Sequence, residues 1–358
     1  MMRFWTSRSL WAQAGRLALL PPALVFQITA TARTNAYRSG WLHRSRLPLP
    51  SIGVGGLAVG GAGKTPVAGW IASWYAERGV RPGILLRGYG GDEGEVHRLA
   101  VGAAVVVEDP DRLRGAHRAH AGGAEVLVLD DAFQRLDVRC DVAMVLVSAE
   151  SVRAARWRVP AGPWREGWRS LRRADLVVVT VKSAGGGVVA EAVQEARAAS
   201  GRDVAVARLE PGPLRGAMTG CPYREGLLAG AHVLVVAGVA DPDAFAAQIG
   251  RQAGRVSLVR KGDHHAYTPR DVRRVLSAAE KVDYVVVTAK DATKLRRLWP
   301  ASAAEPVVAE LTIKWESGRA TVERRLEQVI RASRHPNAVN FHVTGHPVEA
   351  GASAHEQS

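Results

Sequence analysis

The segment from Ser51 to Arg78 constrains the fold more than any other part of the sequence. A short apolar run at residues 52–54 leads into the glycine-rich stretch Ala58-Val59-Gly60-Gly61-Ala62-Gly63-Lys64-Thr65, and residues 66–78 have helical character. A strand, a glycine-rich loop and a helix in this order form the context of a Walker A loop. Glycines let backbone N–H groups close around phosphate oxygens, and the helix N-terminus adds a favourable dipole. We therefore predict that residues 58–65 bind the phosphates of a nucleotide.

Residues 126–131 supply a second part of the same site. The apolar run Val126-Leu127-Val128-Leu129 ends in two carboxylates, Asp130 and Asp131. Such a run is typical of a Walker B strand, which brings carboxylates to the sheet edge where the phosphate loop lies. We expect Lys64 to reach the β and γ phosphates, and Thr65 with one of the two aspartates to serve Mg²⁺ directly or through water. The sequence does not choose between the two aspartates.

Apolar runs alternate with helical stretches along most of the chain, which is the pattern of parallel strands joined by crossover helices. The runs lie at residues 52–54, 84–86, 104–107, 126–129, 142–147, 176–179, 233–236, 256–259 and 284–287. Their continuous apolar character predicts a sheet covered on both faces. The predicted fold class is α/β, with a P-loop NTPase-like parallel-sheet domain (33–208), a hinge (209–228) and a second, smaller α/β domain (229–334). Residues 335–358 lack apolar periodicity, and we expect them to be disordered.

The first 32 residues mix large apolar side chains with arginines, which favours an amphipathic helix lying on a membrane. The longest uncharged run, residues 17–32, is shorter than the roughly 20 residues of a spanning helix, and Pro21 and Pro22 interrupt it. Two other interpretations stay open, a secretory signal and a helix packed on its own domain. The preferred one is a membrane-interfacial helix over residues 1–32.

The charge of the chain favours an anionic partner. The sequence has 48 Lys and Arg against 34 Asp and Glu, a net charge of +14. Phospholipid, phosphorylated glycolipid and nucleic acid all fit such a charge, but no RNA-binding or helix-turn-helix signature is present, so we expect no nucleic acid. The two cysteines, Cys140 and Cys221, form no CxxC pair, which fits a reducing cytoplasm, and no His/Cys cluster predicts a structural metal.

A basic segment lies between the Walker B run and the following apolar run. It contains seven arginines and three tryptophans: Arg153, Arg156, Arg158, Arg165, Arg169, Arg172 and Arg173, with Trp157, Trp164 and Trp168. Arginine binds phosphate in a bidentate manner and tryptophan favours the water–lipid boundary. The segment is therefore a candidate for contact with an anionic glycolipid or membrane surface, and a solvated face is the alternative.

Several separated motifs, taken in their order and spacing, resemble the tetraacyldisaccharide 4′-kinase (lipid A 4′-kinase) family of Gram-negative bacteria. They are Val59-Gly60-Gly61-Ala62-Gly63-Lys64-Thr65-Pro66, Arg87-Gly88-Tyr89-Gly90, Gly91-Asp92-Glu93, Asp130-Asp131-Ala132-Phe133-Gln134-Arg135, Pro160-Ala161-Gly162-Pro163-Trp164-Arg165-Glu166, Gly238-Val239-Ala240-Asp241-Pro242, Asp263-His264-His265 and Thr288-Ala289-Lys290-Asp291. The match extends from the N-terminus to about residue 295.

The resemblance implies transfer of the ATP γ-phosphoryl group, with Mg²⁺, to the 4′ hydroxyl of an acylated glucosamine disaccharide 1-phosphate, giving lipid IVA. It also implies a peripheral protein at the cytoplasmic face of the inner membrane, with two P-loop-like domains joined by a strand hinge and no evident protein partner. Asp92 matches the family's catalytic base, supported by a histidine for which His264 is the first choice and His265 the second. Lys64 completes the catalytic set, and Arg165 and Arg87 are the substrate-binding candidates.

The sequence also departs from the family pattern. Ala58, Ala62, Arg135 and Ala289 replace residues that are usual in the family, and the path from Gly90 to Asp92 is short. None of these changes removes Lys64, Thr65, Asp92 or Asp131.

Two other functions remain possible at this point. One is a P-loop GTPase or metallochaperone-type switch, although the lysine of Thr288-Ala289-Lys290-Asp291 stands one residue late for guanine selection. The other is an inactive membrane-bound scaffold.

Overall fold

The computed structural model describes Trp5, residues 9–88 and residues 92–334. Eleven strands form one continuous sheet in the order β11-β10-β12-β13-β9-β8-β7-β2-β5-β3-β4. Neighbouring strands run parallel except at one place, where β9 and β13 are antiparallel. The predicted α/β fold with a parallel sheet is confirmed.

The first half of the sheet surrounds the phosphate loop. Its strands are β2 (Ser51–Gly56), β3 (Pro82–Leu86), β4 (Val105–Glu108), β5 (Val126–Leu129), β7 (Val142–Ser148) and β8 (Leu176–Val181), and its helices are α4 (Lys64–Ala76), α5 (Asp92–Ala100), α6 (Arg112–Ala121) and α7 (Gly186–Ser200). Short strands β1 (Ser45–Arg46) and β6 (Val138–Arg139) pair beside it. The central strands are buried along their whole length, and three hydrophobic clusters fill this half.

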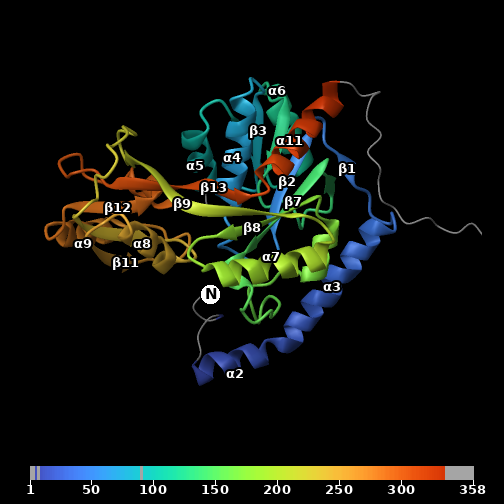
Figure 1. The fold of residues 1–358 in the computed structure, drawn as a ribbon, viewed down its shortest axis with the longest axis horizontal. Helices are drawn as coiled ribbons and strands as arrows, with labels where there is room; N and C mark the ends of the chain where they lie inside the picture. Colours follow the sequence, from blue (N-terminus) through green and yellow to red (C-terminus); the bar gives the residue numbers. More distant parts are fainter. Residues whose placement is uncertain (1–4, 6–8, 89–91, 335–358) are drawn as a thin grey trace, which may run out of the picture.

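The second half contains β10 (His232–Ala237), β11 (Arg255–Arg260) and β12 (Tyr284–Thr288), with helices α8 (Pro242–Gly250), α9 (Pro269–Ala279) and α10 (Ala289–Leu295). Two hydrophobic clusters of its own fill this half. Figure 1 shows it as a separate lobe beside the first half. Each apolar run predicted from the sequence is a strand here, with ends that differ by at most two residues.

The expected hinge, residues 209–228, begins inside a long strand. The long strand β9 (Val204–Gly216) crosses the predicted boundary at 208/209 and pairs with β13 (Val307–Ser317). These two long strands run from one lobe to the other in Figure 1. The strand was not predicted over residues 211–216 because they contain proline and glycine, which have low strand propensity. Pairing with β13 overrides that propensity in the folded protein.

The expected N-terminal helix, residues 1–32, falls partly on residues 1–4 and 6–8, which lie outside the described residues, and helical structure continues beyond it to Arg38. Two helices, α2 (Leu10–Ala18) and α3 (Leu20–Arg38), meet at Leu19. Pro21 and Pro22 lie in the first turn of α3. Backbone N–H groups in a first turn have no acceptor within the helix, so the missing N–H groups of the two prolines cost no hydrogen bond. Large apolar side chains on this pair are exposed, with Leu10 at 81% and Trp11 at 89%. Among the described helices, none has the length and hydropathy needed to cross a bilayer.

The last described helix, α11 (Arg319–Arg334), returns to the first half of the sheet, although its sequence lies within the predicted second domain. Its buried residues Val322, Leu326 and Val329 join the cluster around β2 and α4. The Tyr75 hydroxyl donates to the Leu326 carbonyl at 2.9 Å, and burial raises the pKa of Tyr75. The chain thus crosses between the halves twice, through β9 and through β13. The expected disordered tail, residues 335–358, lies outside the described residues.

Replacing Leu326 with Ala should destabilise the protein by about 2–5 kcal/mol, because it leaves a cavity beneath α11. Denaturant unfolding measures this loss. Arg324→Ala on the exposed face of α11 is the control and should change stability by no more than about 0.5 kcal/mol. Equal unfolding midpoints for Leu326→Ala and the wild type would contradict the packing of α11.

Candidate functional site

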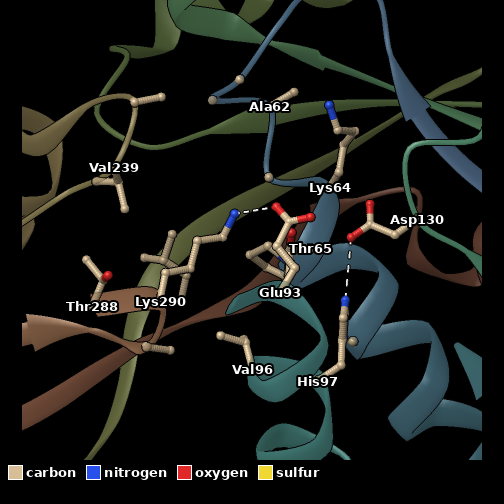
Figure 2. Close-up of a pocket in the computed structure, with 18 of the residues that line it drawn as sticks. Ala62, Lys64, Thr65, Glu93, Val96, His97, Asp130, Val239, Thr288 and Lys290 are labelled. Carbon is tan, nitrogen blue, oxygen red and sulfur yellow. Dashed lines mark hydrogen bonds and ion pairs between the residues drawn. The ribbon is translucent and has the colours of Figure 1, made fainter. Parts of the chain in front are cut away.

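A cleft of about 740 Å³ lies between the two halves of the sheet. The phosphate loop, α5 and the end of β5 line it from the first half, and Val239, His264, Thr288 and Lys290 line it from the second. Figure 2 shows Lys64, Thr65 and Asp130 on one side of this cleft, with Val239, Thr288 and Lys290 across from them. The carboxyl ends of parallel strands meet at such a crevice, which is where α/β folds bind ligands.

The phosphate loop has the backbone that the glycine pattern predicted. Gly60, Gly61 and Gly63 have φ values of 71°, 72° and 76°, and α4 begins directly after Gly63. A side chain at Gly63 would place Cβ 2.5 Å from a methyl group of Leu209, so only glycine fits. The Thr180 hydroxyl holds the loop by donating to the Ala62 carbonyl at 3.0 Å. The loop thus directs the N-terminus of α4 into the cleft, as anion binding requires.

Lys64 points to Asp131, one of the two predicted carboxylates. Lys64 Nζ lies 3.0 Å from Asp131 Oδ1, and Arg165 Nη1 lies 2.8 Å from Asp131 Oδ2. Burial alone would raise the pKa of Asp131, but these two cations lower it to about 2. Asp131 is therefore ionised at neutral pH, and it holds both cations at the phosphate side of the cleft.

Asp130 has a different environment, which includes a residue that the sequence analysis did not single out. Its side chain is 4% exposed, and His97 Nε2 lies 3.4 Å from Asp130 Oδ2 (Figure 2). Burial would raise the pKa of Asp130, but His97 and then Lys64 lower it overall. His97 carried no motif in the sequence, and only the fold places α5 beside β5.

The residues at this edge fit a magnesium ion. Asp130 Oδ1 is buried and has no hydrogen-bond partner in the described part of the chain, so it has a vacant acceptor position. Thr65 lines the same cleft one residue after Lys64. No group of three His, Cys, Asp or Glu side chains gathers for a metal within the described ranges. Magnesium in phosphate sites is held by one or two protein oxygens together with phosphate and water, so Thr65 with Asp130 or Asp131 suffices.

Asp92, the predicted base, begins α5 and meets the second half of the sheet. Its side chain is 1% exposed, and His264 Nδ1 lies 3.4 Å from Asp92 Oδ2. His264 lines the cleft and has a φ of 56° in its loop. The structure therefore brings together the first-choice histidine and the aspartate. His265, the second choice, pairs instead with Asp271 at 3.2 Å.

Two lysines of α10 also reach α5. Lys290 Nζ lies 2.5 Å from Glu93 Oε1, and Lys294 Nζ lies 3.0 Å from Asp92 Oδ2. Burial would lower the pKa of Lys290, but Glu93 raises it overall. Figure 2 shows Lys290 and Glu93 pointing to each other across the cleft. Neither lysine was predicted to belong to the site, because their partners lie about 200 residues away in the chain.

The two predicted substrate-binding arginines lie in the cleft. Arg87 lines it directly, and Arg165 lines it while it pairs with Asp131. Tyr89, Gly90 and Gly91, which complete the motif after Arg87, lie outside the described residues.

The expectation that the tryptophans of the basic segment face lipid is wrong for two of the three. Trp164 and Trp168 are 1% and 8% exposed, and they join the hydrophobic cluster beneath α7. Neighbouring arginines pair with acids, as in Arg153 with Glu191, Arg156 with Glu195 and Arg173 with Glu166. Tryptophans in a basic segment can thus pack in the hydrophobic core instead of contacting a membrane.

Comparison with known proteins agrees with this geometry. The family model described as tetraacyldisaccharide-1-P 4′-kinase matches residues 15–331. A tetraacyldisaccharide 4′-kinase of Aromatoleum aromaticum is 33% identical over 349 residues, covering 91% of this chain and 96% of the relative. One of Anaeromyxobacter sp. is 34% identical over 353 residues, covering 90% and 94%.

A solved structure has the same fold. LpxK from Aquifex aeolicus, crystallised in complex with ATP, superposes with a TM-score of 0.68 at 24% identity and covers 88% of this chain and 99% of that one. The family match extends over both halves of the sheet, and it includes the phosphate loop, Asp92 and His264. The chain belongs to the tetraacyldisaccharide-1-phosphate 4′-kinase family.

Proposed function

We propose that the protein transfers the γ-phosphoryl group of ATP to the 4′ hydroxyl of a tetraacyldisaccharide 1-phosphate, the lipid A precursor, and so gives lipid IVA. Family membership supports the reaction. One observation in the structure carries it: Lys64 of the phosphate loop and His264 of the second half line the same cleft, and His264 pairs there with Asp92 of the first half at 3.4 Å. A nucleotide on one side and an acceptor hydroxyl on the other would be held in line.

Phosphoryl transfer depends on positioning and on charge neutralisation. Lys64 and the N–H groups of the phosphate loop bind the β and γ phosphates. The 4′ oxygen attacks the γ-phosphorus, the bond to the β–γ bridging oxygen breaks, and ADP leaves. The Asp92–His264 pair accepts the proton that the hydroxyl loses, in the manner of general base catalysis.

Charge in the cleft is arranged for a nucleotide to enter. Lys64 and Arg165 both pair with Asp131 at 2.8–3.0 Å, so an incoming phosphate exchanges a carboxylate partner for a phosphate one. Thr65 and the aspartates 130 and 131 would hold Mg²⁺. The ion, when bound, neutralises charge that develops on the phosphates.

The decisive experiment mixes the purified chain with detergent-dispersed disaccharide 1-phosphate, Mg²⁺ and γ-labelled ATP, and follows label in the lipid. Label at the 4′ position supports the proposal. A protein that binds ATP but labels no lipid contradicts it. A parallel reaction with γ-labelled GTP separates the kinase from a guanine-nucleotide switch, which would prefer GTP.

Lys64→Ala should weaken ATP binding by at least about tenfold, because a charge-assisted hydrogen bond to phosphate contributes about 1.5–3 kcal/mol. Titration calorimetry with ATP measures this loss. Arg251→Ala is the control, since that arginine is exposed at the end of α8. Unchanged affinity in Lys64→Ala would place the phosphates elsewhere.

Asp92→Asn should leave ATP binding within about threefold of the wild type and lower kcat by about 10²–10⁴, which is the range for loss of a general base. Labelled lipid formed at saturating ATP gives kcat, and calorimetry gives the affinity. Asp203→Asn serves as control, because the Asp203 side chain is 89% exposed and lies far from Asp92 in the sequence. Wild-type kcat in Asp92→Asn would remove Asp92 from the mechanism.

The same proposal places the protein on the cytoplasmic face of the inner membrane as a peripheral protein. Its acyl-chain substrate resides in a bilayer, and α2 and α3 expose large apolar side chains beside arginines. Leu10 and Trp11 of α2 are 81% and 89% exposed, and Leu24 and Val25 of α3 are 59% and 60% exposed. An amphipathic element of this kind binds at the boundary between head groups and acyl chains.

Trp11→Ser should lower partitioning onto vesicles of phosphatidylethanolamine and phosphatidylglycerol by about tenfold, because burying one large side chain contributes about 1.5–3 kcal/mol. Co-sedimentation with vesicles measures it. Leu99→Ser removes an exposed apolar side chain outside α2 and α3, and it should not change partitioning. Equal losses for both variants would argue against α2 as the contact.

A further inference from the structure

Lys294 contacts the catalytic aspartate, and the mechanism above gives it no role. Its Nζ lies 3.0 Å from Asp92 Oδ2, and its side chain is 17% exposed. His264 Nδ1 approaches the same oxygen at 3.4 Å. Both oxygens of Asp92 and Lys294 Nζ are buried and form no hydrogen bond in the described part of the chain, so the contacts of Asp92 with Lys294 and His264 are ion pairs by distance. Two groups of the second half of the sheet therefore converge on one oxygen of a carboxylate from the first half.

A carboxylate that is 1% exposed needs a compensating charge, because a lone buried anion is costly. His264 supplies positive charge only when it is protonated, and its side chain is 45% exposed. Lys294 is a second basic group within ion-pair distance of Asp92 Oδ2. It can therefore hold the carboxylate in place together with His264.

The helix that carries Lys294 is rigidly anchored. Asp291, with no exposed surface, accepts hydrogen bonds from Gly238 N at 3.0 Å, from the Tyr267 hydroxyl at 2.9 Å and from the Thr288 hydroxyl at 2.6 Å. These bonds tie the start of α10 to the end of β10 and to the segment before α9. Buried networks with every partner satisfied rigidify their surroundings.

Helical periodicity directs both lysines of α10 to α5. Lys290 and Lys294 are four residues apart and so lie on one face of the helix. That face meets the first turn of α5, where Lys290 pairs with Glu93 and Lys294 with Asp92. A more distant pair joins Glu95 of α5 to Arg296, the residue that follows α10, at 4.0 Å.

We propose that Lys294 is a positioning residue for the phosphoryl transfer: it holds the Asp92 carboxylate so that Oδ2 stays in contact with His264. The inference rests on the proposed function and deepens it. Without Lys294, the carboxylate loses one of its two contacts to the second half of the sheet. It can then rotate away from His264, and proton transfer from the 4′ hydroxyl slows although ATP and lipid still bind.

Lys294→Met, which keeps the chain length without the charge, should lower kcat by about tenfold to a hundredfold, the scale of loss for misplacing a catalytic group. KM for ATP and for the lipid should change by less than about threefold. Lys294→Arg should recover part of kcat because it retains the cation. Glu95→Gln is the matched control on α5, since it removes the ion pair with Arg296 at the end of α10 without touching Asp92, and it should keep wild-type kcat.

A double-mutant cycle separates positioning from general damage. In the Asp92→Asn background, Lys294→Met should cause no further loss of kcat, because the carboxylate it holds is absent. Wild-type kcat in Lys294→Met, or an equal loss in both backgrounds, would overturn the proposal.

Failure of the proposed function itself has a different signature, because the wild type and Glu95→Gln would then both label no lipid. In that case the same cycle is measured by denaturant unfolding. If the two substitutions change the free energy of unfolding by less together than the sum of their separate effects, Lys294 and Asp92 interact, which supports the proposal. Additive changes overturn it.

Discussion

The antiparallel pairing of β9 with β13 is the constraint on which the rest of the structure depends. It joins two parallel half-sheets into one, and its register runs from the pair Val307 and Gly216 to the pair Ser317 and Val206. Hydrogen bonds along two long strands fix the orientation of the second half relative to the phosphate loop. Groups that lie 200 residues apart in the chain can therefore meet at atomic distances in the cleft.

Charge pairing determines how the two walls of that cleft are held. On the phosphate side, Asp131 neutralises Lys64 and Arg165. On the opposite wall, α10 brings Lys290 and Lys294 to Glu93 and Asp92. Each pair is partly or fully shielded from water, and a buried charge without a partner is costly. The same cations that pair with these carboxylates are available to bind phosphate.

Much of the site could be predicted from local sequence. The phosphate loop needs only consecutive residues, so Gly60, Gly61, Gly63, Lys64 and Thr65 were readable in order. The predicted strands were recovered because buried parallel strands are continuous apolar runs. The meeting of Asp92 with His264 came from resemblance to a family, since no local pattern links those two positions.

Other features lay beyond the reach of sequence reasoning, each for a physical reason. Trp164 and Trp168 looked like lipid-facing residues because composition does not say which way a side chain points, and both are buried beneath α7. His97 and Lys294 sit on ordinary helices, and only tertiary packing makes the first a partner of Asp130 and the second a partner of Asp92.

The sequence by itself determined the α/β class, the phosphate loop and its carboxylates, because strand burial and loop backbone depend on neighbours within a few residues. Only the tertiary structure decided that β9 and β13 merge the two halves into one sheet, that α11 returns to the first half, and that α10 lies against α5. Those outcomes depend on contacts between segments that are distant in the sequence. The energies of these contacts depend on shape and charge in three dimensions, and the contacts produce no periodic pattern in the sequence.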